Sequence, residues 1–426
     1  MALTIDKATR STAVRPFTVE FLESELDDLL ARVLDARLPE GELVADASQG
    51  VQLDTIRALM HYWGTSYDFR RVESRLNAHP QFVTEIDGID IHFIHVKSQH
   101  KDALPLIITH GWPGSVVEML HVIGPLTDPT AHGGSADDAF DVVIPSIPGY
   151  GFSGKPVGTG WDPARVARAW AVLMDRLGYT EYVAQGGDWG AIITDVMGVQ
   201  APPGLLGIHS NMPGVVPTDI AALLAPLRAD LPSYELAVDE RRAYEQLTRV
   251  YTQGIGYAVE MGLRPQSLYG LADSPVALAA WMLDHDALSY EDITQAFVDG
   301  QPVGSLTRDE VLDNITLTWL TNTGISSGRL YWENTLGFFD VKGVSVPAAV
   351  SVFPKELFQA PRSWAEAAYP NLMYFNEVDR GGHFAAWQEP QLFTEEVRAG
   401  FRPLREPISP GPGHSSARRT GPDGWT

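Results

Sequence analysis

Residues 181–200 read EYVAQGGDWGAIITDVMGVQ, and this stretch decides the fold. The residues up to Gln185 predict a buried strand, and those from Ala191 predict a helix. The turn between them has the small-x-nucleophile-x-small pattern of a nucleophile elbow, with Asp188 where esterases carry serine. We expect glycine at 186 and 190 because strand and helix approach too closely there for a Cβ atom. Taken alone, G-x-D-x-G also fits an ordinary loop, so the assignment depends on the strand–turn–helix context.

Strands and helices alternate on both sides of this turn, which predicts an α/β fold with an eight-stranded, mostly parallel sheet. The alternation stops in a long helical stretch and then resumes, so this stretch is predicted to be a lid. The expected divisions are an N-terminal helical segment (1–80), the first part of the core (81–216), the lid (217–340), the second part of the core (341–401) and a disordered tail (402–426). Residues 1–15 look like a loose lead-in.

Composition excludes several classes of protein. The 426 residues are 44% hydrophobic and 20% charged, as in an ordinary globular protein. A formal net charge of −23 argues against a nucleic acid or an anionic membrane surface as partner. Cysteine is absent, which excludes disulfides, thiol nucleophiles and cysteine zinc sites. No secretory signal or membrane span is visible, so we expect a cytoplasmic protein.

A second glycine-rich turn, His110-Gly111-Trp112-Pro113-Gly114, follows an earlier buried strand. In hydrolases with a nucleophile elbow, such a turn supplies one backbone N–H to the oxyanion hole, and the residue after the nucleophile supplies another. The donors here would be Trp112 and Trp189. Pro113 has no N–H and restricts the turn.

A catalytic triad on this fold needs an acid and then a histidine, in that order along the chain. His383, in a loop after the last predicted strand, suits the base. Glu356 lies just past the preceding strand and is the favoured acid, and Asp379 is the alternative.

An aspartate nucleophile that attacks a saturated carbon forms an ester with its substrate. Epoxides and carbon–halogen bonds both suit this chemistry, and the leaving group separates them. An epoxide oxygen needs a proton donor, such as a neutral tyrosine, whereas a halide needs none. The lid contains six candidate tyrosines: Tyr244, Tyr251, Tyr257, Tyr269, Tyr290 and Tyr331.

From about residue 16 to 400 the chain resembles the epoxide hydrolases of the microsomal and juvenile-hormone type, which have the α/β-hydrolase fold. The motifs that carry the resemblance are PF near residue 16, YWGTSYDFRRVESRLNAHPQFVTEIDGIDIHFIH (62–95), HGWPGS (110–115), PGYGFS (148–153), GGDWG (186–190), DSPVALAAW (273–281) and RGGHFAAWQEP (380–390). We expect no N-terminal membrane anchor like that of the microsomal relatives, because the sequence resembles the soluble bacterial and fungal members.

The resemblance implies a role for each candidate. Asp188 matches the nucleophile, His383 the water-activating base and Glu356 its acid partner. Tyr257 and Tyr331 match the two tyrosines that polarise the epoxide oxygen, although Tyr251 stands near Tyr257 in a similar context. The product would be a vicinal diol, formed without metal or cofactor, in detoxification or secondary metabolism.

Further expectations concern the substrate and the assembly. His110, Pro113 and Phe152 are expected to contact the substrate, and the aromatic residues around the site favour an apolar or aromatic epoxide. A homodimer is possible, because the N-terminal helices carry apolar stripes. Two alternatives remain: a haloalkane or haloacid dehalogenase, and a non-catalytic small-molecule-binding protein on the same fold.

Overall fold

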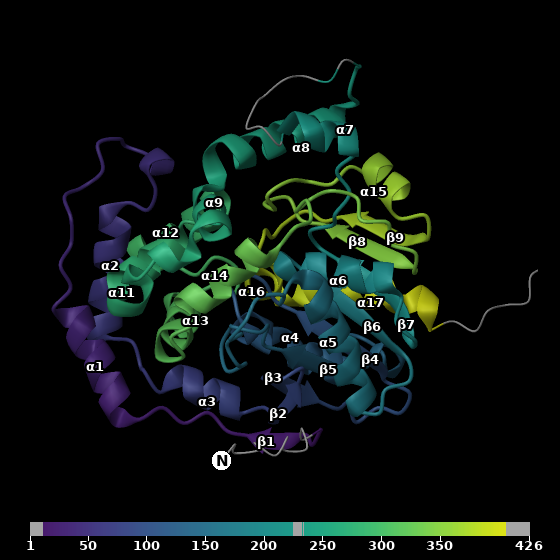
Figure 1. Ribbon diagram of the computed structural model, residues 1–426, viewed down its shortest axis with the longest axis horizontal. Coiled ribbons are helices and arrows are strands. Elements are labelled where there is room, and N and C mark those ends of the chain that lie inside the picture. Colours follow the sequence, from purple (N-terminus) through teal and green to yellow (C-terminus); the bar gives the residue numbers. More distant parts are fainter. Residues whose placement is uncertain (1–11, 225–231, 233, 406–426) are drawn as a thin grey trace, which may run out of the picture.

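The computed structural model describes residues 12–224, 232 and 234–405, and its centre is a nine-stranded sheet (Figure 1). The strand order is β1-β2-β3-β5-β4-β6-β7-β8-β9. Strands β1, β2, β3 and β5 pair antiparallel, and all neighbours from β5 to β9 pair parallel. The strands are β1 (Arg15–Phe17), β2 (Gln81–Ile86), β3 (Ile89–Val96), β4 (Leu104–Thr109), β5 (Phe140–Pro145), β6 (Tyr182–Gly186), β7 (Leu205–Ser210), β8 (Ala348–Val352) and β9 (Leu372–Glu377). The predicted α/β class with a mostly parallel sheet is confirmed.

The sheet has one strand more than the eight predicted. The extra strand, β1, pairs at the edge with residues 81–83 of β2. Its three residues include Pro16, which cannot donate to a strand ladder and is tolerated at a sheet edge. Such a short segment shows no periodicity, and part of it fell in the predicted lead-in. Residues 1–11 of that lead-in lie outside the described residues.

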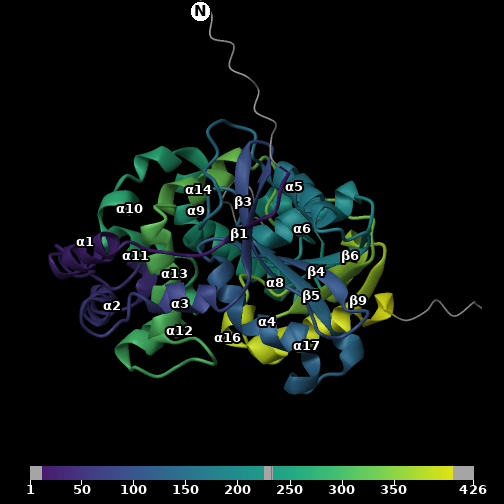
Figure 2. The ribbon, with the colours of Figure 1, turned by 90° about the horizontal axis from the view of Figure 1, so that it is seen from below.

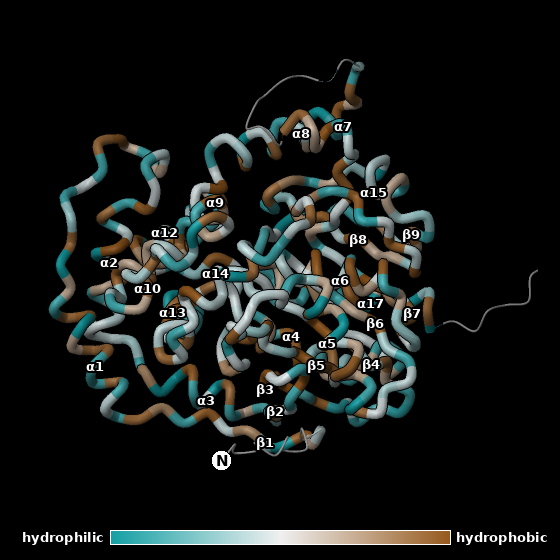
Figure 3. Tube along the Cα trace, in the orientation of Figure 1, coloured by the Kyte–Doolittle hydropathy of each residue, from teal (hydrophilic) through white to brown (hydrophobic). Residues whose placement is uncertain are grey.

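Helices cover both faces of the sheet, because successive side chains of a strand point to opposite faces. The two faces of the sheet therefore bury different hydrophobic clusters. On β4, Ile107 packs in the cluster that contains Trp170 of α5, and its neighbour Ile108 packs in the cluster that contains Val397 of α17. Figure 2 shows the two layers, and Figure 3 shows hydrophobic residues along the central strands. The core helices are α4 (Leu120–Thr127), α5 (Pro163–Arg176), α6 (Trp189–Gln200), α15 (Arg362–Ala368), α16 (Ala385–Gln388) and α17 (Pro390–Phe401).

Helices α7 to α14 connect β7 to β8, in the region predicted as a lid. They are α7 (Thr218–Leu224), α8 (Val238–Arg249), α9 (Gly256–Leu263), α10 (Gly270–Asp273), α11 (Pro275–Leu283), α12 (Ala287–Val298), α13 (Arg308–Leu320) and α14 (Gly324–Glu333). A π-helical turn, η5 (Val250–Gly254), joins α8 to α9. Helices α9 and α14 pack against each other and carry Tyr257 and Tyr331. The lid therefore brings its two predicted catalytic tyrosines together.

The N-terminal segment packs on the lid. Its helices are α1 (Glu23–Leu34), α2 (Leu53–Thr65) and α3 (Arg71–Asn77). Helix α2 contacts α11 and α12, and α3 contacts α13. Figure 1 shows α1 to α3 wrapped around the lid helices, far from most of the sheet. The apolar stripes of α1 and α2, whose buried residues include Leu29 and Leu59, are thus used within the chain.

A cluster of buried charges joins α3 to α13. The Arg75 guanidinium lies 2.7 Å from a Glu310 carboxylate oxygen and 2.6 Å from one of Asp313. Arg71 contacts the same two carboxylates. The indole N–H of Trp387, from α16 in the core, donates to Glu310 at 3.1 Å. One cluster of charges therefore holds the N-terminal segment, the lid and the core together.

The core ends later than predicted. Residues 402–404 form the 3-10 turn η7 (Arg402–Leu404), and the Arg405 guanidinium donates to the carbonyl oxygens of Asp137 and Ala139. The first four residues of the predicted tail are thus ordered against the core, and residues 406–426 lie outside the described residues. Within the described residues, no helix has the length and apolar character needed to cross a membrane.

Candidate active site

Asp188 occupies the sharp turn between β6 and α6. Its backbone is left-handed (φ 52°, ψ −127°), and helix α6 begins at the next residue, Trp189. A Cβ atom on Gly186 would lie 2.0 Å from the carbonyl oxygen of Gly190, and one on Gly190 would lie 1.9 Å from that of Thr109. The close approach that predicted glycine at both positions is confirmed. The turn holds the Asp188 side chain at the carboxyl end of the parallel strands.

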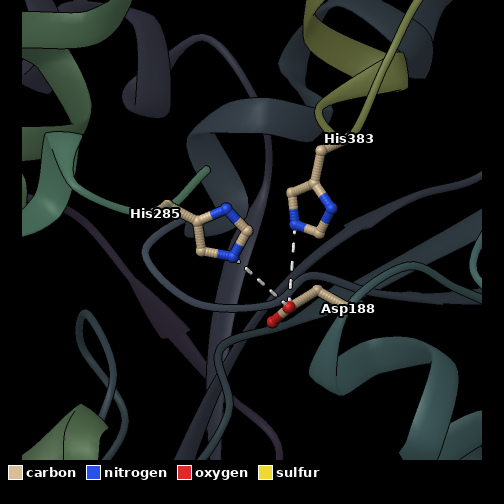
Figure 4. Close-up of side chains that lie close together, drawn as sticks. All are labelled: Asp188, His285 and His383. Carbon is tan, nitrogen blue, oxygen red and sulfur yellow. Dashed lines mark ion pairs between the residues drawn. The ribbon is translucent and has the colours of Figure 1, made fainter. Parts of the chain in front are cut away.

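Three groups surround the Asp188 carboxylate, and Figure 4 shows the two that are imidazoles, His285 and His383. The backbone N–H of Trp112 donates to Oδ1 at 2.7 Å. The Nε2 atoms of His383 and His285 lie 3.6 and 3.8 Å from Oδ2. Burial raises the pKa of Asp188, but the two imidazoles and the Trp112 N–H outweigh burial and lower it. Asp188 is therefore ionised at neutral pH, as a nucleophile must be.

His383 and Glu356 form a buried pair. The Nδ1 atom of His383 lies 2.6 Å from Oε1 of Glu356, and the Leu357 N–H also donates to that oxygen at 2.8 Å. Burial lowers the pKa of His383, but the charge and hydrogen bond of Glu356, together with the Asp188 charge, outweigh burial and raise it. The alternative acid, Asp379, is exposed and pairs with Arg380. The geometry thus places Glu356, and not Asp379, against the imidazole.

The two predicted oxyanion-hole donors flank Asp188. Trp112 donates to its carboxylate as described, and Trp189 is the first residue of α6, where a backbone N–H has no acceptor within the helix. The Trp112–Pro113 peptide bond is cis. The side-chain amide of Asn314 from the lid donates to the Pro113 carbonyl at 2.8 Å. The lid therefore helps to hold the turn that carries one of the donors.

Tyr257 and Tyr331 meet above Trp112. The Tyr257 ring stacks on the Trp112 indole at 4.9 Å, and the centroids of the two tyrosine rings lie 6.0 Å apart. Burial raises the pKa of both tyrosines well above the usual value, and the Asp188 charge raises it further. Both are therefore protonated at neutral pH. Tyr251 packs on Phe339 instead, with ring centroids 6.1 Å apart.

The three predicted substrate-contact residues differ in position. Pro113 lines a small pocket beside the Trp112 turn, together with Trp112, Tyr150, Leu278, Trp281 and Met282. His110 lines a second pocket beside Asp188; its Nδ1 bonds the Gly111 carbonyl, its Nε2 accepts from the Ile147 N–H, and burial lowers its pKa to about 4.

The expectation for Phe152 is wrong. Its ring packs against Phe17, Phe21 and His92, between the N-terminal segment and β3. The PGYGFS turn reverses the chain, so Tyr150 faces the pocket and Phe152 points away.

Two buried residues at the site, His285 and Glu118, were not predicted from the sequence. His285 lies between α11 and α12, with Nδ1 2.9 Å from an Asp286 oxygen. The Asp284-His285-Asp286 triplet would have drawn attention to it. Glu118 lies beside His383 and Asp188, and burial raises its pKa to about 8.

Asp188, His285 and His383 also have the spacing of a metal site. One ligand atom from each lies within 4.8 Å of the others, and all three residues are buried. Each imidazole has its own carboxylate partner on Nδ1, as metal-bound histidines usually do. The site could thus accept a divalent cation, in competition with the protons of the two histidines.

Comparisons with known proteins identify the family. The family profile described as "Epoxide hydrolase N terminus" matches residues 14–119, and that of the "alpha/beta hydrolase fold" matches residues 105–245. A Stigmatella aurantiaca protein provisionally named an epoxide hydrolase is 50% identical over 92% of this chain and 86% of its own. Epoxide hydrolase 1 of Sus scrofa is 34% identical over 92% of this chain and 89% of its own.

The crystal structure of juvenile hormone epoxide hydrolase from Bombyx mori superposes with a TM-score of 0.80, at 30% identity, over 93% of this chain and 96% of its own. Fold and site together define an α/β hydrolase whose nucleophile elbow carries an aspartate, Asp188. Within that fold, the chain belongs to the epoxide hydrolase family.

Proposed function

We propose that this protein converts an epoxide and water to a vicinal diol through a covalent ester on Asp188. One observation carries the proposal. The ionised Asp188 carboxylate lies 3.6 Å from Nε2 of His383, which Glu356 holds, and its charge acts on two buried, protonated tyrosines, Tyr257 and Tyr331. A carbon electrophile that fits between them meets a nucleophile, a proton donor and a base for water.

In the first half-reaction, Asp188 Oδ2 attacks one carbon of the epoxide. The oxygen of the opening ring takes a proton from Tyr257 or Tyr331, which leaves a tyrosinate. The Tyr331 hydroxyl has no hydrogen-bond partner among the described residues, so it is free to bind that oxygen. A halide would leave without a proton, so this pair of hydroxyls favours an epoxide over a haloalkane.

In the second half-reaction, His383 takes a proton from water, and the hydroxide attacks Cγ of Asp188. Glu356 holds the Nδ1 proton of the imidazole, which directs Nε2 at the site of attack. The tetrahedral oxyanion forms on Oδ1, which already accepts the Trp112 N–H, and Trp189 supplies the second donor. Removing one such donor typically costs about 3 kcal/mol.

The substrate is a small epoxide of apolar or aromatic character. The pocket beside the Trp112 turn has large aromatic and aliphatic side chains, among them Tyr150, Trp281 and Met282, and smaller hydroxyl side chains such as Ser115 and Ser327. The large side chains bind apolar surface, and the hydroxyls offer a few polar contacts. The cytoplasmic location and the possible homodimer remain predictions from the sequence, as do the segment boundaries.

A single turnover in ¹⁸O-water tests the covalent mechanism. With enzyme in excess over styrene oxide, the label should enter the Asp188 carboxylate and be absent from the diol. Asp195, on the same helix, is an internal control, because its carboxylate is occupied by Tyr369 and the Gly214 N–H. Peptide mass spectrometry distinguishes the two positions. Label in the diol of the first turnover would mean that water attacks the epoxide directly.

A further inference from the structure

A second imidazole–carboxylate pair faces the nucleophile, and the reaction as described does not use it. His285 is only 2% exposed, and its Nε2 atom lies 3.8 Å from Oδ2 of Asp188. Among the described residues, Nε2 has no partner at hydrogen-bonding distance. A buried ring nitrogen aimed at the nucleophilic oxygen requires an explanation.

Asp286 fixes both the orientation and the charge of this ring. One of its oxygens lies 2.9 Å from Nδ1 of His285, and the other accepts the Ser289 N–H at the start of α12. Oδ2 of Asp188 faces Nε2 on the other side of the ring, so each ring nitrogen points at a carboxylate. Two flanking carboxylates favour the charged form of an imidazole. His285 is thus an imidazolium in the resting enzyme.

The surroundings of His285 decide which proton transfer it can serve. Its ring lies 4.3 Å from that of His383 and 5.1 Å from that of Tyr257. The tyrosines serve the epoxide oxygen and His383 serves water. The atom that His285 faces, Oδ2, is the one that leaves Asp188 with the product when the ester is hydrolysed.

We infer that His285, held by Asp286, is the general acid that protonates this departing oxygen. This inference rests on the proposed covalent mechanism. As the tetrahedral intermediate collapses, the Cγ–Oδ2 bond breaks, its electron pair stays on Oδ2, and Oδ2 takes the proton from Nε2. The diol leaves, and Asp188 remains as a neutral carboxylic acid beside a neutral His285.

The protons then balance. The Asp188 carboxylic acid returns its proton to His285, which restores the resting ion pair. The proton that His383 took from water returns to the tyrosinate left by ring opening. Both protons of the water molecule are thereby accounted for, and no other reactant is needed.

The charge of Asp188 controls when His285 can give up its proton. While Asp188 is ionised, two carboxylates hold the proton of His285. Ester formation removes one of these charges, and a buried cation beside fewer anions gives up its proton more readily. The proton therefore becomes available only while the ester exists.

The test measures ester formation and ester hydrolysis separately by rapid quench and intact-mass spectrometry. His285→Gln should still form the ester with styrene oxide and should hydrolyse it on the order of 10²-fold more slowly than the wild type. The defect should be clearly smaller with para-nitrostyrene oxide, whose product alcohol is more acidic and leaves more readily without a proton. Asp286→Asn should slow hydrolysis in the same pattern.

Asp284→Asn is the matched control, because it removes the same charge from an exposed side chain two residues away. It should hydrolyse the ester at the wild-type rate. Equal losses for the two substrates would show that His285 acts only through packing or general electrostatics. An unchanged rate of hydrolysis in His285→Gln would also overturn the inference.

A measurement on the wild type keeps the inference testable if the variants fail to fold. Across a series of ring-substituted styrene oxides, a protonated leaving oxygen predicts a weak dependence of ester hydrolysis on the acidity of the product alcohol. A steep dependence would contradict it. If no ester forms in the wild type at all, it is the proposed covalent mechanism that fails, so the two failures are distinguishable.

Discussion

The imidazoles of His285 and His383 lie side by side, with ring centroids 4.3 Å apart and planes tilted by 36°, and the Nε2 atoms of both face the same oxygen of Asp188. Each ring has its own carboxylate on Nδ1, Asp286 for one and Glu356 for the other. The two pairs come from opposite sides of the site, one from the lid and one from the core. Two proton-transfer groups thus converge on one nucleophile, which allows one to act as base and the other as acid.

The base can be tested by trapping the ester. In His383→Gln the ester should form but not be hydrolysed, because no group remains to deprotonate water. Intact-mass spectrometry after mixing with styrene oxide should show a stable adduct of one substrate on Asp188. His132→Gln, an exposed histidine far along the chain, is the control and should turn over normally. Wild-type turnover by His383→Gln would refute the assignment.

The tyrosines can be tested through the rate of ester formation. Tyr257→Phe and Tyr331→Phe should each form the ester more slowly than the wild type, but neither should abolish ester formation, because the partner hydroxyl can still donate a proton. The double variant should lose roughly 10²–10⁴-fold, the usual contribution of general-acid catalysis. Stopped-flow tryptophan fluorescence follows this step, because Trp112 packs on the Tyr257 ring and Trp189 on the Tyr331 ring.

Tyr251→Phe is the matched control for the lid tyrosines, since its ring packs on Phe339. It should form the ester at the wild-type rate. If the double variant opens epoxides as fast as the wild type, the tyrosines only pack, and the dehalogenase alternative regains support.

The pH dependence of turnover follows from the His383–Glu356 pair. His383 must be neutral to accept a proton, and its pKa is raised above 6.5 by Glu356. The rate of ester hydrolysis should therefore fall on the acidic side as the pH drops through that raised pKa, and it should fall again at high pH, where His285 loses the proton that the inferred acid must donate. Glu356→Gln should move the acidic limb to lower pH and reduce the plateau. A limb that stays in place in this variant would show that Glu356 does not set the pKa of the base.

Zinc should inhibit the enzyme, whereas chelation should leave it active. Every step of the proposed reaction is assigned to a side chain, so EDTA should not alter turnover. Added Zn²⁺ can bind Asp188, His285 and His383, whose ligand atoms lie within 4.8 Å of one another. It must displace the imidazole protons, so binding should strengthen as the pH rises. Titration calorimetry with Zn²⁺ should show weaker binding in His285→Gln than in Asp284→Asn.

Much of the site could be predicted because chain order and local pattern specify it. The elbow at Asp188 needs a strand, two glycines and a helix, all of which are visible within twenty residues. His383 and Glu356 each follow a predicted strand, and the carboxyl ends of parallel strands meet at one edge of the sheet. The likeness to a known family added the two tyrosines, which no local pattern identified.

The remainder depends on packing that local patterns do not encode. His285 lies in a short connection between lid helices, and only the fold of the lid over the sheet brings it to Asp188. Phe152 was misassigned because the direction of a side chain after a tight turn depends on where the chain reverses. Strand β1 escaped notice because three residues with a proline have no period.

The charge cluster of Arg71, Arg75, Glu310 and Asp313 bears on how this enzyme can be re-engineered. Removing the two arginines would leave the buried Asp313 carboxylate without a counter-charge and Glu310 with only His121 beside it, which is strongly destabilising. A lid transplanted from a relative would therefore need its own α3 partner. The lid and α3 would have to be exchanged together, although they are not contiguous in sequence. The paired arginines and carboxylates lie more than 230 residues apart along the chain, so a chimaera cut only at the ends of the lid would combine partners from two different proteins.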